Sequence, residues 1–120
     1  MPTPPHILVA NEPAAYRDML ASELPRLRPH LTVLQVEPAD LDSVVTRIHP
    51  RLVICSRLTH AIRQHATALI VLYPHGTNRA ILDIDGEQQV LPNPELTELL
   101  AAIDNAFDPT RRPYRLPTRE

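Results

Sequence analysis

Residues 6–13, His-Ile-Leu-Val-Ala-Asn-Glu-Pro, decide the fold class of this chain. Four consecutive apolar residues precede two polar residues and a proline, which is typical of a strand buried on both faces of a parallel sheet. Apolar side chains then recur at helical spacing from residue 14 to residue 24. We expect Pro25 to end that helix, because proline cannot donate into the hydrogen-bond ladder. The chain therefore begins with a buried strand followed by an amphipathic helix.

The alternation of strand and helix continues through residues 31–73. Residues 31–36 are rich in aliphatic and β-branched side chains, and Pro38 opens a helix whose apolar positions 41, 44, 45 and 48 share one face. Pro50 closes that helix, and residues 52–56 form another apolar run. Thr59 is suited to cap a short helix that reaches about Ala66, before a fourth strand at residues 68–73. This order predicts a parallel sheet with crossover helices.

Residues 80–91 break this rhythm. Residues 80–84 and 87–91 flank Asp85-Gly86, the signature of a tight hairpin, so we expect an antiparallel pair instead of a crossover helix. A last helix follows, for which Asn93 is the expected N-cap and Pro94 the first helical residue. The predicted fold is α/β, with three layers and a doubly wound, mostly parallel sheet in which a β-hairpin replaces the fourth crossover helix.

Length and composition predict one domain. At 120 residues, with 43% apolar and 22% charged residues, the chain has the balance of an ordinary globular domain. We expect an N-terminal extension at 1–5, a domain at 6–107 and a flexible tail at 108–120, which is rich in proline and arginine. The chain has no apolar run long enough to span a bilayer and no signal-peptide pattern at its start, so we expect a cytoplasmic protein without membrane contact.

Two missing residue types exclude several functions. The chain has no lysine, which excludes Schiff-base chemistry and a P-loop lysine. Its two glycines, Gly76 and Gly86, are too few for a dinucleotide fingerprint or a Walker loop. The net charge of −2 and the scattered arginines give no basic stripe for nucleic acid. We therefore expect no cofactor and no nucleic-acid partner.

The carboxyl ends of the parallel strands are the expected place for a ligand, because the loops converge there. The side chains that these loops bring together form a candidate pocket, which could bind a small polar ligand or simply cap the strand ends: Asn11, Glu12, Ser56, Arg57 and Tyr73.

Catalytic and metal sites are not indicated by the sequence. Ser56 has no histidine placed beside it by sequence logic, as a nucleophile would need. His60 and His65 are five residues apart and fall on different helix faces, so together with Cys55 and His75 they do not form a zinc site. Among the acidic residues, Asp85 is explained by its turn and Asp83 by an exposed strand face, which leaves Glu12 without a partner for acid–base work. We expect a protein that is not an enzyme and holds no metal.

Three segments resemble the receiver domains of two-component response regulators. They are Ile-Leu-Val-Ala-Asn-Glu-Pro at 7–13, His-Pro-Arg-Leu-Val-Ile-Cys-Ser at 49–56, and Val-Leu-Pro at 90–92 before the last helix. The resemblance covers residues 6–107 and implies a flavodoxin-like sheet. It also implies positions for an acidic pair, a phosphoacceptor aspartate, a hydroxyl residue and a lysine.

This chain departs from the family at each of those positions. Aligning Pro13 with the family's proline puts Ala10 and Asn11 at the acidic pair, and a slip of one residue would use Asn11 and Glu12. Ser56 stands at the phosphoacceptor position. Leu72 or Tyr73 stands at the hydroxyl position and Leu91 at the lysine position. Since magnesium prefers carboxylate oxygens and an acyl phosphate needs a carboxylate, we expect the phosphorylation switch not to operate.

The resemblance leads to a functional expectation. We expect a pseudo-receiver in signal transduction that binds a protein partner, or a second copy of itself as a dimer, without phosphorylation. The expected surface lies on the hairpin beside the last helix and comprises Arg79, Ile81, Asp83, Glu87 and Gln89. The alternatives are a sensor that binds a small ligand at the strand ends, and a catalyst for which no acid–base pair can be assembled.

Overall fold

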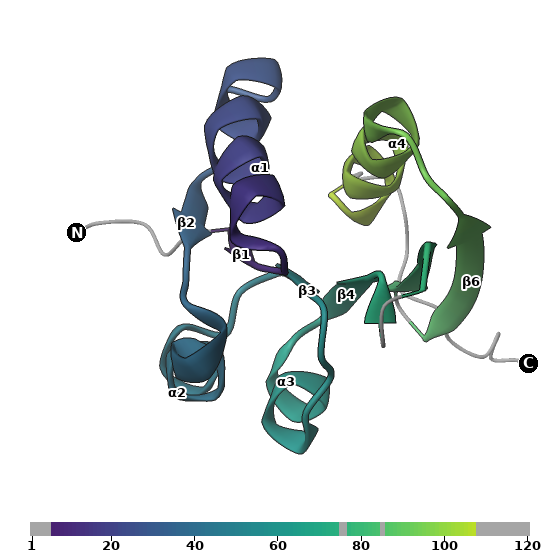
Figure 1. The fold of residues 1–120 in the computed structure, drawn as a ribbon. Helices are drawn as coiled ribbons and strands as arrows, with labels where there is room; N and C mark the ends of the chain where they lie inside the picture. Colours follow the sequence, from purple (N-terminus) through teal and green to yellow (C-terminus); the bar gives the residue numbers. More distant parts are fainter. Residues whose placement is uncertain (1–5, 75–76, 85, 108–120) are drawn as a thin grey trace, which may run out of the picture.

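A computed structural model describes residues 6–74, 77–84 and 86–107 as one mixed sheet between two layers of helices (Figure 1). The predicted extension at 1–5, the tail at 108–120, His75 and Asp85 lie outside the described residues. No helix within the described ranges is long and apolar enough to cross a membrane.

The sheet has six strands in the order β2-β1-β3-β4-β5-β6. Strands β2, β1, β3 and β4 are parallel, whereas β5 pairs antiparallel with both β4 and β6. This topology confirms the predicted fold class, including the hairpin in place of a fourth crossover helix. The strand bounds are β1 (Ile7–Ala10), β2 (Val33–Gln35), β3 (Leu52–Cys55), β4 (Ala68–Leu72), β5 (Arg79–Ile84) and β6 (Glu87–Pro92).

Among the described residues, two helices cover each face of the sheet (Figure 1). Figure 1 shows α1 (Ala14–Leu27) and α4 (Leu96–Ala106) on one face, and α2 (Leu41–Ile48) and α3 (His60–His65) on the other. A short 3-10 turn, Pro38–Asp40, leads into α2. The apolar core is correspondingly divided: one cluster contains Ile103 of α4 with Leu82 of β5, and the other contains Val45 of α2 with Val53 of β3.

Side-chain contacts join the two helices of each layer. The Arg28 guanidinium, just after α1, binds the Asp104 carboxylate of α4 through two bonds of 2.6 and 2.7 Å. This contact lowers the pKa of Asp104. On the other face Thr59 caps α3, as predicted, by accepting a bond from the Ile62 N–H. The Thr59 hydroxyl also donates to Asp42 of α2 over 2.6 Å.

Two helix boundaries differ from the predictions. The expectation that Pro25 ends α1 is wrong, because the proline lies in the last turn and the helix continues to Leu27. Asn93 and Pro94 do not begin α4: Asn93 has a φ of 45° and the helix starts two residues after Pro94.

The actual N-cap of α4 is Glu95. Its side chain accepts a bond from the backbone of Glu98, and the Glu98 carboxylate accepts one from the Glu95 N–H over 2.8 Å. This reciprocal pair is a capping box, which satisfies two of the N–H groups that the helix leaves without partners.

The hairpin leaves part of the sheet uncovered. Right-handed crossovers put α2 and α3 on the same face, and a further crossover in that direction would have added a helix there. Because β5 returns antiparallel, no helix of the described residues covers this face of β5 and β6 (Figure 1). We call this surface the open face; its side chains, placed by strand alternation and register, are Arg79, Ile81, Asp83, Gln88, Val90 and Pro92.

Truncating a side chain on the covered side of the hairpin should cost much more folding free energy than truncating one on the open face. Ile103 of α4 is fully buried against the covered face, so Ile103→Ala should lower the free energy of unfolding by about 2–5 kcal/mol. Val90 on the open face is 50% exposed, and Val90→Ala should change it by no more than about 0.5 kcal/mol. Urea denaturation measures both values. A loss at Val90 as large as that at Ile103 would mean that the open face is covered.

Candidate functional site

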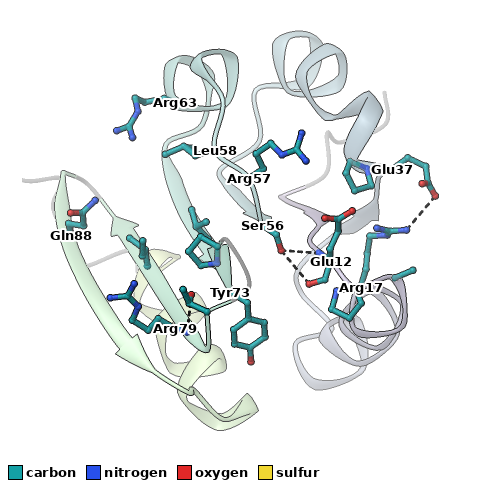
Figure 2. Close-up of a pocket in the computed structure, with 17 residues that line it drawn as sticks. Glu12, Arg17, Glu37, Ser56, Arg57, Leu58, Arg63, Tyr73, Arg79 and Gln88 are labelled. Atoms are coloured by element: carbon teal, nitrogen blue, oxygen red, sulfur yellow. Dashed lines mark hydrogen bonds and ion pairs between the residues drawn. The ribbon is translucent and has the colours of Figure 1, made fainter.

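A groove of about 1100 Å³ runs from the carboxyl ends of the parallel strands onto the open face (Figure 2). Four of the five predicted pocket residues line it, namely Glu12, Ser56, Arg57 and Tyr73. Asn11 is fully buried and is not among the lining residues. The groove therefore has a strand-end half, formed by the loops after β1 and β3, and a hairpin half that reaches β5 and β6.

Ser56 joins two loops at the strand-end half. It follows β3 directly, and its Oγ accepts a hydrogen bond of 2.9 Å from the Glu12 N–H. The same hydroxyl donates to the Glu12 carbonyl over 3.3 Å. The hydroxyl thus holds the loop after β1 against the end of β3, and Figure 2 shows both bonds.

Arg17 forms the buried wall of this half. It lies on α1, donates through a terminal nitrogen to the Asn11 carbonyl over 3.2 Å, and pairs with the Glu37 carboxylate at 3.5 Å. The Asn11 side-chain amide and the Arg17 Nε have no hydrogen-bond partner among the described residues. Arg17 therefore links α1 to the loops after β1 and β2 through one hydrogen bond and one ion pair.

Tyr73 forms the boundary between the groove and α1. Its backbone has a φ of 53°, and its N–H donates to the Arg79 carbonyl over 2.7 Å, which closes the loop between β4 and β5. The ring stacks on Tyr16 with centroids 5.8 Å apart. Burial, followed by the contact with Tyr73, raises the pKa of Tyr16 above its ordinary value. The Tyr16 ring is therefore a neutral packing group at neutral pH.

The hairpin half combines an apolar floor with cationic sides. Its floor comprises Leu58, Val71 and Ile81, and Figure 2 shows Arg63 of α3 and Arg79 of β5 on opposite sides of it. Neither guanidinium, nor that of Arg57, makes an ion pair or a hydrogen bond with the described residues. The arrangement can therefore take up apolar surface flanked by negative charge.

The five predicted surface residues do not share one face. Arg79, Ile81 and Asp83 lie on the open face, whereas Glu87 and Gln89 pair with Ile84 and Leu82 and lie on the α4 side. Strand alternation and the hairpin register therefore divide the five candidates between the two faces of the sheet, and their role in an interface stays a prediction. Gln88 and Val90 occupy the positions on β6 that face the same way as Ile81.

Catalytic and metal-binding groups are not clustered in the described part of the chain. No group of three His, Cys, Asp or Glu residues there could hold a metal ion. The rings of His49 and His65 are tilted by 59° with centroids 5.0 Å apart, and no third His, Cys, Asp or Glu of the described residues joins them in a metal-binding group. Burial raises the pKa of the Cys55 thiol to about 12, which keeps it protonated at neutral pH.

Several groove residues were not predicted from the sequence, among them Arg17, Arg63 and Leu58. Arg17 could have been found, because it shares the buried helical face of Leu20 and Leu24 at spacings of three and seven residues. Arg63 gave no signal, since it is an exposed residue of a short helix. Leu58 lies in a loop, and only the tertiary structure brings it to the groove.

Comparisons with protein-family models, with curated proteins and with solved structures each give no match for this chain. What the structure shares with the resemblance is an α/β fold whose mostly parallel sheet starts in the order 2-1-3-4.

Ser56→Ala should lower the free energy of unfolding by about 1 kcal/mol, because it removes the bridge between the loops after β1 and β3. Ser22→Ala is the matched control, since Ser22 is exposed on α1 and makes no side-chain bond. Thermal or urea unfolding compares the two variants. Equal stability of the two variants would contradict the bridging role.

Proposed function

We propose that this protein is a non-catalytic, receiver-like interaction module that binds a protein partner through its open face without phosphorylation. The observation that carries the proposal is the uncovered half-sheet, where Ile81 and the half-exposed Val90 lie side by side in register. An exposed apolar strip beside charged residues is characteristic of a protein-binding surface. Its position next to the groove extends the surface toward α3.

The receiver-like origin rests on the landmarks of the strand ends. The sheet begins in the order 2-1-3-4, Asn11 follows β1, and Ser56 follows β3. These are the places where the resembled family carries its acidic pair and its phosphoacceptor. In this chain an amide and a hydroxyl occupy them, and the Ser56 hydroxyl is already bonded to the Glu12 backbone.

A small polar ligand at the strand ends is less well supported. Two polar side chains of the strand-end half are engaged within the protein, Ser56 by the Glu12 backbone and Arg17 by Glu37 and the Asn11 carbonyl, which leaves the Arg57 guanidinium as the cation there without a bond to the described residues. Arg63 and Arg79, whose guanidinium groups make no bond with the described residues, lie instead in the hairpin half. The geometry therefore favours the interaction module over the sensor.

Val90→Glu should weaken association with the natural partner at least tenfold, because it places a charge in the apolar strip. Gln89→Glu is the matched control, with the same new charge one residue away on the opposite face of β6. Tagged variants are isolated from cells of the source, and bound partners are quantified by native mass spectrometry. Equal partner occupancy in both variants would show that the open face is not the interface.

Incubation with magnesium and a small acyl-phosphate donor should leave the protein mass unchanged. The residue that ends β3 offers a hydroxyl instead of a carboxylate, and no acidic pair stands at the end of β1 to hold the metal. Intact-mass spectrometry measures the result, and Ser56→Asp tests whether a carboxylate there restores uptake. A stable gain of one phosphoryl group by the unmodified chain would overturn phosphorylation independence.

A further inference from the structure

The distribution of partner-free arginines identifies the chemistry of the surface. Of the arginines in the described residues, Arg17, Arg26, Arg28 and Arg51 bond to acidic groups or carbonyls of the protein. Four guanidinium groups make no such bond there: Arg47, Arg57, Arg63 and Arg79. All but Arg47 line the groove. Within the described residues, the groove therefore gathers three of the four arginines whose guanidinium groups make no bond to the protein.

The groove has an arrangement of residues that suits the binding of one helix. Its apolar floor, Leu58, Val71 and Ile81, continues across the register pair to Val90. Figure 2 shows Arg63 and Arg79 on opposite sides of that floor, with Gln88 at its outer edge. In a three-layer α/β fold a helix packs its apolar stripe on the sheet, and the place beside α3 is the one that the hairpin leaves without a helix.

This inference rests on the proposed function. We propose that the partner supplies the missing helix, an acidic amphipathic helix whose apolar stripe packs on Leu58, Ile81 and Val90. Carboxylates on both sides of the stripe bind Arg63 and Arg79, which are suited to paired hydrogen bonds with carboxylates. The bound helix completes the layer formed by α2 and α3.

Charge complementarity favours an acidic helix from another protein over segments of this chain as the occupant of the groove. Residues 108–120 contain four arginines and two acidic residues, so this segment would bring further positive charge to a cationic groove. A second copy offers no suitable helix within the described residues, because α1, α2, α3 and α4 each bury their apolar residues in their own core. An acidic helix from a different protein meets both requirements.

Selection of displayed peptides against the full-length protein tests the proposal. The library presents helix-forming peptides of about 18 residues, roughly 27 Å long, with a fixed leucine stripe. The positions on both sides of the stripe vary among Glu, Gln and Arg. We expect Glu to be enriched on both sides, and the selected peptides to bind about tenfold more weakly to Arg79→Glu and to Arg63→Glu.

Control variants separate recognition from stability. Arg47→Glu makes the same charge change on α2, outside the groove, and should bind the peptides like the wild-type chain. Because Arg63 lies in the last turn of α3, where a basic residue favours the helix, Arg63→Gln is measured as well. Circular dichroism confirms that each variant is folded before binding is compared.

Other outcomes overturn the proposal in distinguishable ways. Enrichment of Arg, or no charge preference, in peptides that still lose binding to Val90→Glu would refute the acidic helix and leave the interaction function standing. Pairing of the chain with itself through Val90, or inorganic phosphate binding the groove more tightly than any selected peptide, would identify a different occupant. If neither the natural partner nor the peptides depend on Val90, Arg63 or Arg79, both proposals fail.

Discussion

The tight turn between β5 and β6 determines how the rest of the sheet is used. Gly86 has a φ of 87°, a conformation that glycine adopts without the steric cost of a Cβ. The turn sends the chain back beside β5, so two strands are added to the sheet with no crossover helix between them. One face of those strands is buried by α4, whereas the other keeps its apolar residues at the surface.

The same turn explains why the groove exists, because it replaces a crossover helix that would fill this space. A crossover helix after β4 would have occupied the space beside α3 and covered Ile81. With the hairpin, Ile81 packs only partly against the cluster of α2 and α3, while Leu82 next to it is buried under the opposite layer. The difference between these neighbouring residues shows that the surface results from topology and not from an unusually apolar sequence.

Much of the architecture could be predicted because it depends on local pattern. The runs 7–10, 52–55 and 68–72 are apolar throughout, as strands covered on both faces require, and Asp85-Gly86 marks the change to an antiparallel pair. The cap of α4 was missed because its side-chain acceptor is a glutamate, Glu95, whose partner Glu98 completes the box, while Asn93 has the composition of a cap but a left-handed backbone.

The candidate site was harder to predict because it depends on which charges find partners. Arg28 pairs with Asp104, 76 positions away, and Arg17 pairs with Glu37, whereas Arg79 finds no acidic partner among the described residues. Sequence spacing does not distinguish these arginines, since each lies near acidic residues in the chain. Only the tertiary structure shows which cations are neutralised internally and which face the groove.

An apolar strip beside an edge strand would ordinarily promote association between identical chains. β6 is an edge of the sheet, and Val90 is half exposed on it, which together favour pairing of two copies edge to edge. Arg79 stands on the same face, and Pro92 opposite it has no N–H to donate to a further strand. The open face carries Arg79 and one acidic residue, Asp83, whereas the adjoining groove is lined by four arginines and two glutamates and so has an excess of positive charge. In the proposed mode of binding, this excess of positive charge opposes a second copy and attracts an acidic partner.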